Sequence, residues 1–146
     1  MFMDELPLKN YAHIGDAVWE VFVRDYVILK TSNSKLLHKM TTDRVNAVFQ
    51  KEMLEFINEF LTDTEQDMVR RARNLSIPIG RRSIQHDYRL ATAFEVLIGY
   101  WYLHNKDRLN YFYDKIKTTE YFNWLLLINN YVTKCFCDII KAYNKD

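Results

Sequence analysis

The chain has 146 residues, of which 49% are hydrophobic, 15% aromatic and 27% charged, with a net charge of +1. This composition is typical of a folded domain and excludes an intrinsically disordered protein. Three glycines and two prolines are too few for a turn-rich β fold, so we expect an all-α protein.

Cysteine content and hydropathy restrict where the protein works. Cys135 and Cys137 cannot build a disulfide framework. The first residues lack the bases and the apolar core of a secretory signal. The longest apolar stretch, residues 122–132, contains three asparagines and is too short to cross a bilayer. We therefore expect a soluble protein without membrane association, in the cytoplasm or, in a eukaryotic source, inside an organelle.

The spacing of apolar residues predicts about seven helices in a single domain over residues 1–146. The first is expected over about residues 8–30, with Asp4 and Pro7 at its start. Its expected apolar face contains Tyr11, Ile14, Val18, Val21 or Phe22, and Tyr26.

The remaining predicted helices follow with few interruptions. Two are expected over about residues 32–40 and 43–60, the second opened by Thr42. Thr62 and Glu65 form a capping-box pattern for a helix that reaches residue 73. After a loop over residues 75–85, further helices are expected over about residues 87–104, 107–117 and 119–143.

Charge is unevenly distributed along the chain. Residues 1–69 carry twelve acids and seven bases, whereas residues 70–89 carry six arginines and one acid. The arginine fork matches the oxygens of phosphate, so this block is a candidate anion site. A solvated, salt-bridged surface is an equally good interpretation of the charge alone. The six residues are Arg70, Arg71, Arg73, Arg81, Arg82 and Arg89.

Two carboxylates interrupt strongly apolar helical runs. Asp16 lies within residues 14–23, and Glu95 lies within residues 91–101. A buried carboxylate requires a partner, which is either an arginine (Arg24 or Arg89 here) or a divalent metal ion. Glycines inside both helices, Gly15 and Gly99, indicate close approach of another backbone. Glu20 lies one turn after Asp16 and is more simply explained as a solvated residue.

The ordered sequences of residues 11–24 and 91–100, with the arginine-rich residues 70–74 and Tyr88–Arg89 between them, resemble the ribonuclease III catalytic domain. In detail they are similar to its short form, Mini-ribonuclease III. The resemblance covers about residues 6–117 and leaves residues 118–146 as a divergent C-terminal helix. It implies an all-α, homodimeric endoribonuclease that cuts double-stranded RNA with Mg²⁺, for which Mn²⁺ substitutes, and without a nucleotide cofactor.

The resemblance also assigns roles to residues. Asp16 and Glu95 match the metal-binding, catalytic carboxylates. Other ribonuclease III enzymes carry two further acids, where this chain, like the short form, has Ala12 and Thr92. We expect Glu20 to orient a water molecule and the six arginines to bind RNA phosphates. Structured precursor RNA such as ribosomal RNA is the expected substrate.

Three alternatives remain open at this point. The first is a catalytically silent RNA-binding or assembly subunit of the same fold. The second is an all-α nucleotide pyrophosphohydrolase, since Glu52 and Glu55 have the E-x-x-E spacing of those enzymes, with Glu59 four residues further on. A purely structural helical bundle is the third, but it leaves the acids at positions 16 and 95 unexplained.

Overall fold

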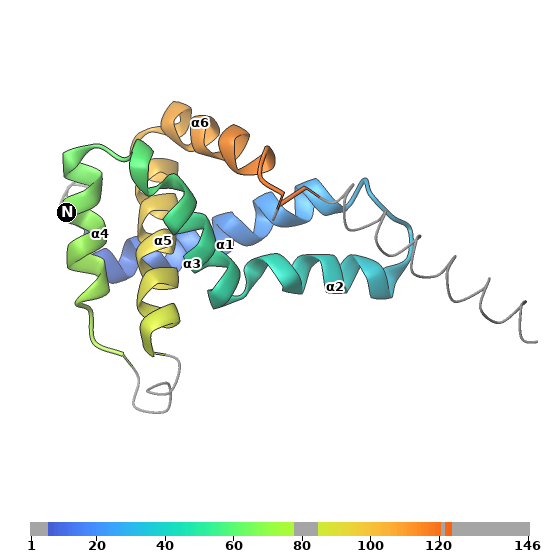
Figure 1. The fold of residues 1–146 in the computed structure, drawn as a ribbon, viewed down its shortest axis with the longest axis horizontal. Helices are drawn as coiled ribbons and strands as arrows, with labels where there is room; N and C mark the ends of the chain where they lie inside the picture. The colour runs from blue at the N-terminus through green and yellow to red at the C-terminus, as the bar shows by residue number, and fades with distance from the viewer. Residues whose placement is uncertain (1–5, 78–84, 121, 124–146) are drawn as a thin grey trace, which may run out of the picture. The chain divides into compact units, whose positions relative to one another are not determined.

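The computed structural model describes residues 6–77, 85–120, 122 and 123 (Figure 1). Within these residues the structure is helical and contains no strand, which confirms the all-α prediction. The elements are α1 (Leu8–Val27), α2 (Ser34–Val45), α3 (Ala47–Ile57), the 3-10 helix η2 (Asn58–Phe60), α4 (Asp63–Arg73), α5 (Gln85–His104) and α6 (Lys106–Lys117). In the described part of the chain, no helix is long and apolar enough to cross a membrane.

The chain divides into two units, residues 1–112 and 113–146. The first unit contains α1 to α5 and the first half of α6, and it carries the whole candidate site. Of the second unit the structure describes residues 113–120, 122 and 123, and most of the helix expected over residues 119–143 lies outside this part. The single-domain assignment stays a prediction.

Helix α5 is the centre of the first unit, where it packs against α1, α3 and α4 (Figure 1). Its buried residues lie on nearly all sides and include Phe94, Leu97 and Trp101. Trp19 of α1 is fully buried and packs edge-on against the Phe94 ring. The Trp19 indole donates to the backbone oxygen of Arg44 at the end of α2, so the hydrogen bond ties α2 to this core.

The boundary between α2 and α3 differs from the prediction. Helix α2 continues to Val45, and the break falls at Asn46 rather than near residues 40–42. The Asn46 side-chain oxygen accepts from the backbone N–H of Phe49, so Asn46 and not Thr42 caps α3. Helix α1 begins after Pro7 and ends at Val27, three residues before the predicted end.

The buried face of α1 is also rotated from the predicted one. Tyr11 and Phe22 are buried as expected, but the stripe between them runs through Gly15 and Trp19. Val21 is 58% exposed. A glycine carries no apolar side chain, so the hydropathy pattern alone does not place position 15 in the core, although a glycine inside a helix does indicate a close backbone neighbour.

Glu65 connects three helices through hydrogen bonds. It completes the predicted capping box with Thr62 at the start of α4. Its Oε1 also accepts from the Trp101 indole in α5 and from Arg108 Nε in α6, and its Oε2 accepts from Arg108 Nη2. Burial raises the pKa of Glu65, but the hydrogen bonds from Arg108, Thr62 and Trp101 outweigh it and leave this pKa below its ordinary value.

Candidate active site

The two motif helices meet at their glycines. A Cβ atom added to Gly15 would lie 1.8 Å from the backbone oxygen of Glu95, and one added to Gly99 would lie 2.0 Å from the backbone oxygen of Tyr11. Each glycine therefore accepts the backbone of the opposite helix, which explains why both positions lack a side chain. This contact places Asp16 next to the turn of α5 that carries Glu95.

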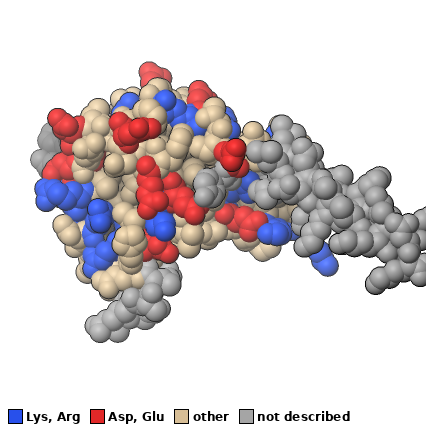
Figure 2. Space-filling view, viewed as in Figure 1, with Lys and Arg blue, Asp and Glu red and all other residues tan. Residues whose placement is uncertain are grey.

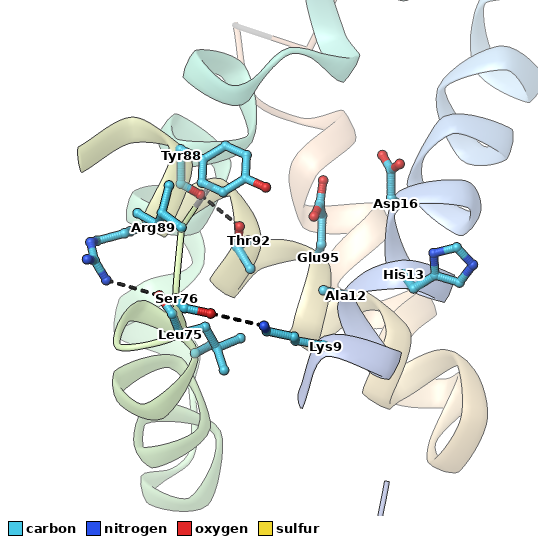
Figure 3. Close-up of a pocket in the computed structure, with 12 residues that line it drawn as sticks. Lys9, Ala12, His13, Asp16, Leu75, Ser76, Tyr88, Arg89, Thr92 and Glu95 are labelled. Carbon is cyan, nitrogen blue, oxygen red and sulfur yellow. Dashed lines mark hydrogen bonds between the residues drawn. The ribbon is translucent and has the colours of Figure 1, made fainter. Parts of the chain in front are cut away.

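Asp16 and Glu95 line one pocket of about 330 Å³. Figure 3 shows their side chains beside each other, Asp16 from α1 and Glu95 from α5. The α1 wall consists of residues spaced three or four apart, which share one helix face. The α5 residues of the lining lie on the side of that helix that does not face the core. Ala72 of α4 and the residues that follow this helix complete the lining. The lining residues are Lys9, Ala12, His13, Asp16, Ala72, Leu75, Ser76, Ile77, Tyr88, Arg89, Thr92 and Glu95.

The two carboxylates of this pocket affect each other electrostatically. Burial and, after it, the negative charge of Asp16 raise the pKa of Glu95 to about 7, while the Gln50 amide acts in the opposite direction. Within the described residues neither Asp16 nor Glu95 forms an ion pair with a base. Two neighbouring carboxylates without a basic partner repel each other, and a proton or a bound cation relieves this repulsion.

The donor set suits a hard divalent ion. Carboxylate oxygens are the ligands that Mg²⁺ and Mn²⁺ prefer, and Mg²⁺ is commonly held by one or two carboxylates together with water and substrate phosphate. No group of three or more acidic, histidine or cysteine side chains able to hold a metal occurs in the part of the chain that the structure describes. The residues present therefore fit a site in which the protein supplies two carboxylates.

The predicted arginines divide into three groups. Arg70, Arg73 and Arg89, with Asn74, line a second pocket of about 360 Å³, and Arg89 also lines the carboxylate pocket. In Figure 2 basic side chains gather over the end of the molecule that α4 occupies in Figure 1. Arg71 pairs with Asp67, which also binds Arg70. Arg81 and Arg82 lie outside the described residues.

Arg89 lines both pockets and also forms hydrogen bonds to the backbone near the end of α4. Its Nη1 donates to the backbone oxygens of Arg73 and Leu75 at the end of α4. A cation at this position satisfies carbonyls that the helix leaves open. Arg89 therefore holds the end of α4 against α5 where the two pockets meet.

Glu20 does not line the carboxylate pocket. Its Oε1 accepts from Arg24 one turn further along α1, and both side chains are exposed. The structure therefore places Glu20 at a solvated position, as the sequence pattern favoured, and pairs it there with Arg24. Its role in orienting water stays a prediction.

Sequence reasoning missed several residues of the pocket. Lys9 and His13 precede Asp16 by seven and three residues, so helical spacing alone would have placed them on its face. Lys9 Nζ donates to Ser76 Oγ across the pocket (Figure 3). The effect of Gln50 on the pKa of Glu95 had no sequence signal beyond a polar residue in an apolar stripe.

Residues 9–106 match the family model described as the Ribonuclease III domain. The chain belongs to the ribonuclease III family. It is 42% identical over 104 residues to the Mini-ribonuclease 3 of Gloeobacter violaceus, covering 71% of this chain and 77% of that protein. The Mini-ribonuclease 3 of a Synechococcus strain is 36% identical over 117 residues, which cover 80% of this chain and 85% of the relative.

A crystal structure of a Fusobacterium nucleatum protein has a similar fold. Its TM-score is 0.68 at 28% identity, and the match covers 77% of this chain and 92% of that one. The protein is thus an endoribonuclease of the ribonuclease III type, as the motifs predicted. Ala12 and Thr92, the positions that the sequence resemblance matches to further acids of other family members, both line the carboxylate pocket of this ribonuclease III protein.

The pyrophosphohydrolase alternative has no support. Glu55 and Glu59 are exposed, and none of the three acids at positions 52, 55 and 59 lines either pocket.

Proposed function

We propose that this ribonuclease III protein hydrolyses phosphodiester bonds of double-stranded RNA with Mg²⁺ or Mn²⁺, and that Asp16 and Glu95 hold the metal ion. One observation carries the proposal: two carboxylates from different helices line one pocket, and within the described residues neither has a basic partner. The backbone contact of Gly15 with Glu95 supports it, because it fixes the two acids relative to each other.

When bound, a divalent ion at this position supplies Lewis acidity and lowers the pKa of bound water. The protein's own groups then have separate tasks. Asp16 and Glu95 provide the oxygen ligands. Lys9 and Arg89 at the pocket wall reduce the negative charge of an entering phosphate, and Arg70 and Arg73 bind a phosphate further along the strand.

The proposed substrate, double-stranded RNA, and the proposed homodimer belong together. A-form RNA is recognised through its shape and backbone, and two copies of the site would each face one strand. Exposed apolar side chains on and after α1 support a protein interface, because such residues are costly to leave in water. They are Val21, Ile28 and Leu29. Structured precursor RNA, with ribosomal RNA first, is the substrate we propose in the cell.

The proposal is tested by cleavage of a perfect RNA duplex in a Mg²⁺ titration. Asp16→Asn and Glu95→Gln are expected to lower the cleavage rate at least 10²-fold while remaining folded dimers in sedimentation. Asp25→Asn, on the exposed side of the same helix as Asp16, is the matched control and is expected to cleave normally. Unchanged cleavage by Asp16→Asn or Glu95→Gln would contradict the assignment. An inactive wild type that still binds the duplex would favour the silent-subunit alternative.

A further inference from the structure

Gln50 is a polar residue buried in the apolar face of α3. It is 2% exposed, and the other buried residues of this helix are Phe49, Met53, Leu54 and Ile57. Placing an amide in such a face is unfavourable unless the amide is hydrogen-bonded. A leucine or methionine would fill the same space without this cost, so the polar group requires a reason.

Helix α3 packs against α5, the helix that carries Glu95, and the Gln50 amide acts on the Glu95 carboxyl group from this side. It lowers the pKa of Glu95, opposing burial and Asp16, which is the effect of a donor that faces a carboxylate. Within the described residues, however, the buried Nε2 atom has no hydrogen-bond partner of normal geometry. The Gln50 amide N–H is therefore a donor still available to Glu95. It would approach Glu95 from the side away from the pocket, because Gln50 does not line the pocket.

The chemistry of a metal-binding carboxylate explains this arrangement. One oxygen faces the cation, and the group holds a fixed orientation only if the protein also binds it from another side. A neutral amide does this without adding a positive charge, whereas a lysine or arginine would compete with the metal ion. On α1, Glu20 cannot perform this task because it is paired with Arg24.

We infer that Gln50 is a positioning residue, whose side-chain amide donates to Glu95 and holds this carboxylate toward Asp16 in the cation-bound site. The inference rests on the proposed function, since it requires a cation between the two acids. It assigns to α3 a part in a site that is otherwise built from α1, α5 and the end of α4.

The test measures Mn²⁺ binding in the absence of RNA, with the full chain. Gln50→Met retains the length of the side chain and removes the amide, and Gln66→Met on the exposed side of α4 is the matched control. We expect Gln50→Met to bind Mn²⁺ about 10–100-fold more weakly, the range found for groups that orient metal ligands. Without metal it is expected to be at least as stable as the wild type, because a buried unpaired amide is removed.

Cleavage kinetics add a second readout. The half-saturating Mg²⁺ concentration of Gln50→Met is expected to rise by a similar factor, while kcat at saturating Mg²⁺ changes only a few-fold. A merely structural residue would lower stability and leave both metal affinities unchanged. If Asp16→Asn abolishes Mn²⁺ binding and Gln50→Met does not weaken it, the inference about Gln50 is wrong and the proposed function stands. If Asp16→Asn binds Mn²⁺ normally, the proposed function fails.

A measurement on the wild type covers the case in which Gln50→Met does not fold. The side-chain amide protons of Gln50, assigned by NMR in the ¹⁵N-labelled protein, are expected to shift downfield on Mg²⁺ addition as the hydrogen bond to Glu95 forms. Side-chain amide signals of Gln66 are expected to stay in place. Gln50 signals that do not move at saturating Mg²⁺ would overturn the inference.

Discussion

Gly15 and Glu95 are in direct backbone contact, so close that a single added carbon at position 15 would lie 1.8 Å from the Glu95 carbonyl oxygen. The contact joins the helix of one acid to the helix of the other. The glycine is therefore part of what fixes the distance between the two carboxylates.

Gly15→Ala is expected to lower the free energy of unfolding by about 1–3 kcal/mol or more, because overpacking usually costs this much. Alanine stabilises a helix by about 1 kcal/mol relative to glycine. The measured loss of stability is therefore smaller than the cost of the clash. Urea unfolding followed by circular dichroism measures the effect. Gly99→Ala, whose added carbon would lie 2.0 Å from the Tyr11 oxygen, is expected to behave alike. Wild-type stability in both variants would show that the helices are further apart than described.

Glu65→Gln is expected to cost about 2 kcal/mol of unfolding free energy, because it weakens charge-assisted hydrogen bonds from Arg108. The folded protein lowers the pKa of Glu65. Its contribution is therefore present above the unfolded-state pKa and is lost as the pH falls through the lower folded-state value. Unfolding experiments at pH 7 and in acid measure this difference, and an equal cost at both would contradict the ion pair. Glu59→Gln, at an exposed position, is the control.

The sequence predicted the helices, and the meeting of Asp16 with Glu95, better than it predicted the core. Thr62 and Glu65 carry a local capping signal, so the start of α4 was located correctly. The face of α1 was misplaced because Gly15 is buried by a backbone from a distant part of the chain, which leaves no trace in hydropathy.

The surroundings of the acids were less predictable. Glu95 could be recognised because an acid in an apolar run is costly, but the same argument does not say which group faces it. Gln50 lies 45 positions away on another helix, and only the packing of α3 on α5 brings the two together. Glu20 was chosen for its spacing from Asp16, and spacing does not show that Arg24 is its partner.

Replacing Arg70 and Arg73 together by glutamine is expected to weaken duplex binding and to flatten its salt dependence. Each phosphate contact contributes roughly 0.9 to the slope of log affinity against log salt for duplex DNA, so the slope is expected to fall by about 1–2. Binding of a labelled RNA duplex between low and physiological salt measures this slope. Replacing Lys30 and Lys35, which line neither pocket, is the control. A slope equal to that of the wild type would return Arg70 and Arg73 to the solvated-surface interpretation.

Glu95 makes metal binding and stability depend on pH. Its pKa is raised from 4.5 to about 7, so the metal-free folded state holds this proton more tightly than the unfolded chain does. Without divalent ions, the contribution of Glu95 to stability is expected to fall as the pH rises from about 4.5 to 7. Mn²⁺ affinity is expected to rise over the upper part of this range, because the cation displaces the proton.

Titrations with Mn²⁺ at several pH values, and unfolding in a chelator, measure both trends. Glu95→Gln is expected to remove the contribution of Glu95 to the pH dependence of stability. The same pH dependence in wild type and Glu95→Gln would contradict the assignment of the raised pKa to this residue.

The central claim is that Asp16 and Glu95 share one divalent cation, and anomalous diffraction from a crystal soaked in Mn²⁺ tests it most directly. The account predicts an anomalous peak between the two carboxylates in the wild type and its loss in Asp16→Asn. A well-soaked crystal with no peak at this pocket, or with a peak that persists in Asp16→Asn, would contradict the account.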